Sequence, residues 1–240
     1  MRIIYRISES GYNKVKPDYI NNKNCLENAI KCFPSAAWLI IGDNLSDDTR
    51  KMVEDAAPGA DFSSVKVGHG AGTFNLALDE ALKLNDDEIV YFLENDYLHR
   101  ENSDKIIEDV LSVNDSLIGT LYSHKDKWIP AKKGGNPYVD DDGAEVTKVY
   151  LGKKHAYMLT NSTTMTFFCK VKTLREIEPI LRKHTNGRHP NDFQMFIELR
   201  EMGYALVQPV PPSYATHGET NWLAPLLTDE SDVDAWGKIV

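Results

Sequence analysis

The chain has 240 residues, of which 42% are hydrophobic and 26% are charged, and its formal net charge is −9. This length is sufficient for a sizeable buried core. The net negative charge and the lack of a long basic run disfavour a nucleic-acid binder that neutralises phosphates. A local basic patch is still compatible with this net charge.

The sequence shows neither a signal peptide nor an apolar segment long enough to span a membrane. Its three cysteines, Cys25, Cys32 and Cys169, lack the spacing of metal ligands. We therefore expect reduced thiols in the core rather than disulfides or zinc ligands. Together these features predict a soluble, cytoplasmic protein.

The first half of the chain alternates between segments typical of strands and of helices. Strands are predicted at 2–7, 37–41, 64–67, 89–93 and 117–122. Helices are predicted between them, at 25–33, after the N-cap Ser46, at 74–82 and at 105–113. This alternation predicts an α/β fold with a mostly parallel sheet covered by helices on both faces.

The second half has a different pattern. Residues 123–146 are rich in Lys, Gly, Pro and Asp and predict a long loop. Strands follow at 148–151, 157–160, 164–169 and 205–209, with one helix capped near Thr173 and another that has Pro190 in its first turn. The tail from 211 onward has little periodicity. We expect one domain over 1–240, with a parallel half over about 1–122 and a mixed half over 123–240.

An acidic triplet, Glu94-Asn95-Asp96, ends the apolar run 89–93. Side chains two apart on a strand point the same way, so both carboxylates can meet one hard cation. An ordinary solvated turn explains the triplet equally well. Open α/β sheets bind ligands at the carboxyl ends of their strands. The other polar or Gly-rich positions at such ends are Arg6, Ser8, Asp43, Gly70 and Gly72.

This order of segments resembles the GT-A fold glycosyltransferases, especially the family 2-like inverting enzymes. In that family an acidic residue after the second strand contacts the base, and a Gly-containing loop and helix precede an Asp-any-Asp motif. Asp43 stands at the first position here, and Glu94-Asn95-Asp96 at the second. The resemblance implies that 1–122 is the nucleotide-sugar half, with donor contacts from Arg6, Ser8, Asp43, Gly70, Gly72, Glu94 and Asn95.

The resemblance also implies a metal site and a general base. Asp96 would bind Mn²⁺ or Mg²⁺ directly, and Glu94 would reach the metal through water or contact the ribose. His217, in the C-terminal segment, would be a further metal ligand, although most loop histidines are not. Asp192 would deprotonate the acceptor hydroxyl, or merely help to cap its helix. Asn191 stands where the family often has a further acid.

Two clusters in the second half are candidates for the sugar or acceptor pocket. One contains His124, Asp126 and Trp128, which follow a predicted strand and equally suit a solvated loop. The other contains Ser162 and Thr163, whose hydroxyls suit an acceptor and whose β-propensity suits an ordinary strand connection.

The sequence thus predicts a metal-dependent, inverting glycosyltransferase that moves a sugar from a nucleoside diphosphate, with UDP favoured, to a hydroxyl acceptor. The acceptor would be a saccharide, a protein or a modified nucleobase, and the acidic charge argues weakly against DNA. A sugar-nucleotide nucleotidylyltransferase is the nearest alternative, but Ser8-Glu9-Ser10-Gly11 lacks its basic Gly-rich signature. The other alternative is a non-catalytic protein that binds a nucleotide or a carbohydrate.

Overall fold

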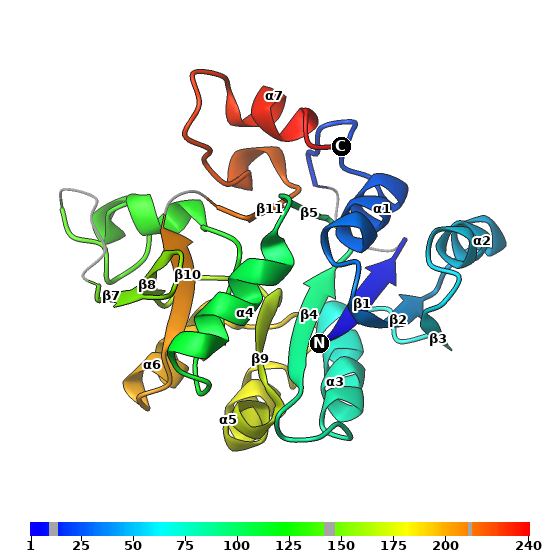
Figure 1. The fold of residues 1–240 in the computed structure, drawn as a ribbon, viewed down its shortest axis with the longest axis horizontal. Helices are drawn as coiled ribbons and strands as arrows, with labels where there is room; N and C mark the ends of the chain where they lie inside the picture. The colour runs from blue at the N-terminus through cyan, green and yellow to red at the C-terminus, as the bar shows by residue number, and fades with distance from the viewer. Residues whose placement is uncertain (10–13, 142–146, 211–212) are drawn as a thin grey trace.

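The computed structural model describes residues 1–9, 14–141, 147–210 and 213–240. Within them a nine-stranded sheet runs in the order β3-β2-β1-β4-β9-β6-β10-β8-β7 (Figure 1). Its strands are β1 (Arg2–Ser8), β2 (Ala37–Asp43), β3 (Asp61–Val65), β4 (Ile89–Glu94), β6 (Ile118–Gly119), β7 (Val149–Leu151), β8 (Ala156–Thr160), β9 (Phe167–Lys170) and β10 (Leu206–Val210).

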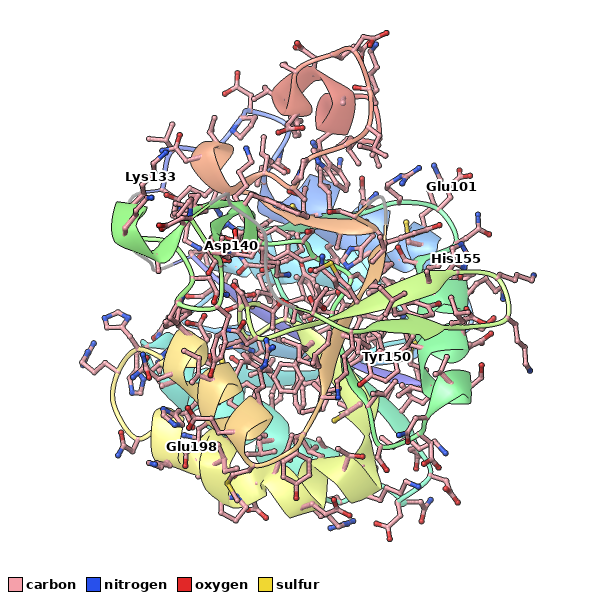
Figure 2. All side chains as sticks on the ribbon, turned by 90° about the vertical axis from the view of Figure 1, so that its left-hand side faces the viewer. Glu101, Lys133, Asp140, Tyr150, His155 and Glu198 are labelled. Atoms are coloured by element: carbon pink, nitrogen blue, oxygen red, sulfur yellow. The ribbon has the colours of Figure 1, made fainter. Side chains whose placement is uncertain are left out.

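The sheet is mixed. Strands β3, β2, β1 and β4 are parallel neighbours, and β9 then runs antiparallel to both β4 and β6. Beyond it β10 is parallel to β6, whereas β8 and β7 form an antiparallel hairpin at the far edge; Tyr150 and His155 mark it in Figure 2. The α/β prediction with parallel N-terminal strands is confirmed.

Helices cover both faces because alternate residues of the central strands point to opposite sides. The helices are α1 (Asn22–Cys32), α2 (Asp47–Ala56), α3 (Gly70–Ala81), α4 (Ser103–Val113), α5 (Val171–His184), α6 (Asp192–Glu201) and α7 (Asp232–Gly237). Ile3 and Tyr5 of β1 belong to the core cluster that includes residues of α1 and α4, whereas Ile4 belongs to the cluster with α3, α5 and α6. Short 3-10 helices lie at Lys125–Trp128, Ala131–Lys133 and Thr220–Trp222.

Two local predictions are confirmed, the helix cap at Ser46 and the reduced, buried cysteines. Ser46 caps α2, accepting a hydrogen bond from the Thr49 amide. The three cysteines are free and buried. No helix among the described residues is long and apolar enough to cross a bilayer. The one-domain reading stays a prediction.

Other local predictions are wrong in detail. Thr173 lies inside α5, which begins at Val171 because carbonyls of Glu88 and Asp86 accept from its first amides. Pro190 precedes α6 instead of lying in its first turn. The strand predicted at 117–122 forms a ladder only over β6, and beyond it Tyr122 forms a single parallel bridge with Ala215. The strand predicted at 64–67 begins earlier, at Asp61, where it pairs with β2.

The tail predicted to have little periodicity also forms elements. Strand β11 (Ala215–His217) pairs antiparallel with β5 (Tyr97–His99), which directly follows the acidic triplet. This separate two-stranded sheet brings His217 opposite Tyr97 in register. The pairing depends on residues more than 100 positions apart, so no local sequence pattern indicates it.

Candidate active site

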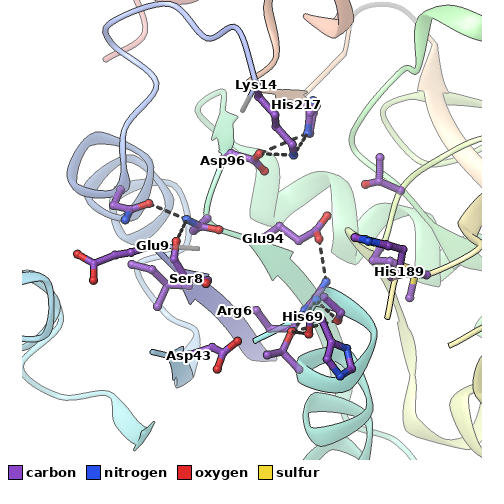
Figure 3. Close-up of a pocket in the computed structure, with 18 of the residues that line it drawn as sticks. Arg6, Ser8, Glu9, Lys14, Asp43, His69, Glu94, Asp96, His189 and His217 are labelled. Atoms are coloured by element: carbon purple, nitrogen blue, oxygen red, sulfur yellow. Dashed lines mark hydrogen bonds and ion pairs between the residues drawn. The ribbon is translucent and has the colours of Figure 1, made fainter. Parts of the chain in front are cut away.

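A cavity of about 1120 Å³ opens at the carboxyl ends of β1, β2 and β4 (Figure 3). Parallel pairing places Arg6 beside Glu94 and Ser8 beside Asp43 at this edge. The predicted site residues that line it are Arg6, Ser8, Asp43, Gly70, Glu94, Asn95, Asp96, Asp192 and His217.

Arg6 and Glu94 form an ion pair on the cavity floor. Arg6 Nη2 lies 3.1 Å from Glu94 Oε1, and its Nη1 donates to the Gly70 carbonyl at 3.2 Å. The Arg6 side chain is buried, whereas the Glu94 side chain is 29% exposed. Glu94 therefore already has a cationic partner, and the Arg6 guanidinium connects β1, β4 and the start of α3.

Asp43 is occupied by the loop that leads to α3. Its Oδ1 accepts from the Val67 amide at 2.7 Å, and its Oδ2 accepts from the Gly68 amide at 2.8 Å. The Asn44 side chain donates a third hydrogen bond to Oδ1. Asp43 is 2% exposed. The Asp43 carboxylate therefore shapes the cavity wall, because it fixes the start of the loop 67–70.

Asp96 lies between two lysine ammonium groups. Lys14 Nζ is 2.8 Å and Lys16 Nζ is 3.1 Å from Asp96 Oδ2. His217 Nε2 is 3.4 Å from that oxygen and 3.1 Å from Lys14 Nζ. Burial raises the pKa of Asp96, but His217 and the two lysines outweigh it and hold that pKa well below its usual value.

Asp192 is the first residue of α6 and faces the same cavity as Glu94. Burial, followed by the negative charge of Glu94, raises the pKa of Asp192 to about 6. Its Oδ1 accepts from the Phe193 amide at 2.8 Å. A carboxylate with this pKa is mostly ionised at pH 7 yet basic enough to take a proton, so Asp192 can act as a general base.

Two further predicted donor residues have structural partners. The Asn95 side-chain amide donates to the Ser8 carbonyl at 3.2 Å and to Asn22 Oδ1 at 2.6 Å. Gly72 lies behind the cavity wall, where its amide donates to the N-cap His69. A Cβ there would come within 2.4 Å of Val67 Cγ1, so the close approach requires glycine.

The candidates for the acceptor pocket lie elsewhere. None of them is among the described residues that line the cavity: His124, Asp126, Trp128, Ser162 and Thr163. Asp126 accepts from Ser162 Oγ at 2.6 Å and lies 2.9 Å from His124 Nδ1. The His124 ring stacks on Trp222, and Trp128 is 50% exposed. His124 still lies close enough to lower the pKa of Asp192 in part.

Sequence reasoning missed five basic or imidazole residues of the cavity as site residues: Lys14, Lys16, His69, Arg188 and His189. A usable signal was present for two of them. Lys14 and Lys16 follow the first predicted strand, and that loop lies at the ligand-binding edge of such a sheet. Arg188 and His189 directly precede the Asp192 segment.

No protein-family profile and no curated protein sequence matches the chain. Solved structures do. The chain matches GalNAc-T7, solved with UDP, GalNAc and Mn²⁺, with a TM-score of 0.58 and 11% identity over 100% of this chain and 48% of that one. TarS of S. aureus matches with a TM-score of 0.53 and 12% identity, over 89% of this chain and 36% of that one. GlyE, a glycosyltransferase of Streptococcus pneumoniae TIGR4 solved in its apo form, matches with a TM-score of 0.50 and 9% identity, over 99% of this chain and 59% of that one.

The chain spans less than two thirds of the length of each of these three neighbours. The likeness extends over nearly all of this chain at identities that carry information on fold alone. Together with the parallel half-sheet and the cavity at its carboxyl edge, these matches show that the protein has the fold of the GT-A glycosyltransferases.

Proposed function

We propose that the protein is an inverting glycosyltransferase that moves a sugar from a nucleoside diphosphate, with UDP favoured, to a hydroxyl acceptor. The observation that carries the proposal is the position of Asp192. Its carboxylate, with a pKa of about 6, lines the same cavity as the acidic triplet at the end of β4. A base and a donor site in one cavity are what direct displacement requires.

The charge of the cavity supports a diphosphate ligand. Lys14, Lys16 and Arg188 line it together with the Arg6–Glu94 pair. Ammonium and guanidinium groups form strong, charge-assisted hydrogen bonds with phosphate oxygens. The fold neighbour GalNAc-T7 was solved with UDP, which supports a uridine donor here by analogy of fold.

In the proposed reaction the acceptor oxygen attacks the anomeric carbon as the bond from that carbon to the phosphate oxygen breaks. The bonding electron pair leaves with the nucleoside diphosphate, and the hydroxyl proton moves to the Asp192 carboxylate. Attack opposite the leaving group inverts the configuration. Asp192 makes the acceptor oxygen a better nucleophile, and the basic residues offset the charge that develops on the diphosphate.

The predicted Mn²⁺ or Mg²⁺ stays a prediction, and the residues present do not fit it well. Two of its expected ligand atoms, Asp96 Oδ2 and His217 Nε2, both lie within 3.1 Å of Lys14 Nζ. Glu94 is paired with Arg6. Among the described residues no group of three or more His, Cys, Asp or Glu side chains is arranged to hold a metal ion.

The proposal is tested by measuring thermal stabilisation by UDP, GDP and dTDP, each in Mn²⁺ and in EDTA, followed by hydrolysis of the corresponding nucleotide sugars. We expect one nucleotide to raise Tm and its sugar conjugate to be hydrolysed slowly. Stabilisation without hydrolysis or transfer to any saccharide, protein or nucleobase acceptor would instead identify a binding protein. If no nucleotide raises Tm in either condition, the proposed function is wrong.

A further inference from the structure

Each acidic residue of the triplet has its own cationic partner from the N-terminal segment. Arg6 of β1 pairs with Glu94, and Lys14 of the following loop pairs with Asp96 (Figure 3). Lys16 of the same loop also pairs with Asp96. Lys14 lies 2.8 Å from Asp96 Oδ2 and 3.1 Å from His217 Nε2, so it contacts both atoms that a metal ion would need.

From this arrangement we propose that Lys14 and Lys16 take the place of a divalent ion and neutralise the donor diphosphate directly. The inference rests on the proposed function and identifies how that same site binds its leaving group. Two ammonium groups carry the same formal charge as one divalent ion, and each offers N–H donors to phosphate oxygens.

A divalent ion at this position would meet two obstacles. Lys14 Nζ already lies 2.8 Å from Asp96 Oδ2 and 3.1 Å from His217 Nε2. Because His217 Nδ1 accepts from the Glu219 amide, the neutral imidazole carries its proton on Nε2 and has no lone pair there for a metal ion. An ion bound there beside both lysines would place four positive charges around one carboxylate, and like charges at such distances repel strongly. Metal binding would therefore require the displacement of Lys14.

Residues 14–16, which include both lysines, are held by the C-terminal segment. The Thr220 amide donates to the Val15 carbonyl at 2.8 Å, and the Thr220 hydroxyl donates to the same oxygen at 3.0 Å. The backbone between the two lysines is thus fixed, while their side chains, 19% and 29% exposed, line the cavity. Cations that are positioned before the reaction lose little energy in reorganising as the leaving group becomes charged.

The test measures the Kd of UDP, GDP and dTDP by calorimetry in EDTA and in Mn²⁺. We expect the nucleotide that binds to have the same Kd within about twofold in both conditions. Binding that requires Mn²⁺ would overturn the inference and leave the proposed function standing. Binding in neither condition would overturn the proposed function as well.

A lysine double variant, Lys14→Gln with Lys16→Gln, gives a second readout. In EDTA its Kd should rise at least about tenfold, because charge-assisted contacts to the diphosphate are lost. The matched control is Lys23→Gln, which removes an exposed lysine of α1 that does not line the cavity. Removing both lysines also removes the two positive charges beside Asp96, so the double variant should bind Mn²⁺ without nucleotide more tightly than the wild type. Equal Mn²⁺ affinity in the two proteins would contradict the inference.

Discussion

Asp192 is the first residue of α6, and its environment favours the protonated form of its carboxyl group. The raised pKa of Asp192 should therefore be visible in the pH dependence of the reaction. Because the pKa is about 6, the base is protonated below that pH. We expect kcat/KM to fall about tenfold per pH unit below pH 6 and to level off above it. A profile that stays flat from pH 5 to pH 8, or breaks far from 6, would contradict the role of Asp192 as base.

Replacing this carboxylate separates catalysis from helix capping. Asp192→Asn should lower kcat by about 10²–10⁴-fold with little change in nucleotide affinity. Asp47→Asn is the matched control, since Asp47 is also the first residue of a helix but is exposed and outside the cavity. If both variants keep wild-type kcat, Asp192 has only a structural role.

Asp192→Asn should also be more stable than the wild type at neutral pH. The folded-state pKa of Asp192, about 6, lies above the ordinary value of 3.8, so the folded protein favours the protonated form. Its stabilising contribution is present below pH 3.8 and is lost as pH rises through 6. The free energy that corresponds to this pKa shift is reduced because Asp192 is partly exposed to solvent. We therefore expect Asp192→Asn to raise the free energy of unfolding by about 1–2 kcal/mol at pH 8 and by much less near pH 4. Urea unfolding at both pH values measures this, and an equal gain at the two would show that ionisation is not the cause.

At the scale of elements, Asp43 connects the end of β2 to the loop that begins α3. Asp43→Ala would remove the buried carboxylate that accepts from the amides of Val67 and Gly68. We expect a loss of about 2–4 kcal/mol in the free energy of unfolding. Nucleotide affinity should fall too, because Gly68 and Gly70 line the cavity. Asp61→Ala, which removes an exposed ion pair with Arg2, should cost less than about 1 kcal/mol and serves as the control. Equal losses would refute the anchoring role.

The elements also show which parts of the site local sequence could predict. Arg6, Asp43 and the triplet end strands with clear apolar patterns, so their place at one sheet edge follows from parallel alternation. By contrast, the Asp96–Lys14 contact depends on a loop that has no periodicity of its own. The approach of His217 depends on pairing between β5 and β11, two three-residue strands. The position of Lys14 near the ligand-binding edge could therefore be predicted from its loop, but its contacts with Asp96 and His217 could not.

At the scale of the whole molecule, the segment around α7 lies beside residues 14–20, the described part of the chain between β1 and α1 (Figure 1). The Tyr19 hydroxyl donates to the Val233 carbonyl at 2.7 Å, and Thr220 holds Val15. Trp236 of α7 is fully buried, and its indole N–H donates to the Ala224 carbonyl at 2.8 Å. Packing of the last 25 residues thus supports the loop from which Lys14 and Lys16 reach the cavity.

Trp236→Ala should therefore affect both stability and binding, although Trp236 does not line the cavity. Truncating a fully buried Trp costs about 3–5 kcal/mol, measured by urea unfolding. Because α7 would then pack poorly against the segment of Tyr19, we expect the two lysines to be less fixed. The Kd of the bound nucleoside diphosphate should rise at a temperature where the variant is still folded. Trp128→Ala, at a half-exposed position, should change stability by less than about 1 kcal/mol. A Trp236→Ala protein that is less stable yet binds the nucleotide as the wild type does would show that the lysine loop is positioned without α7.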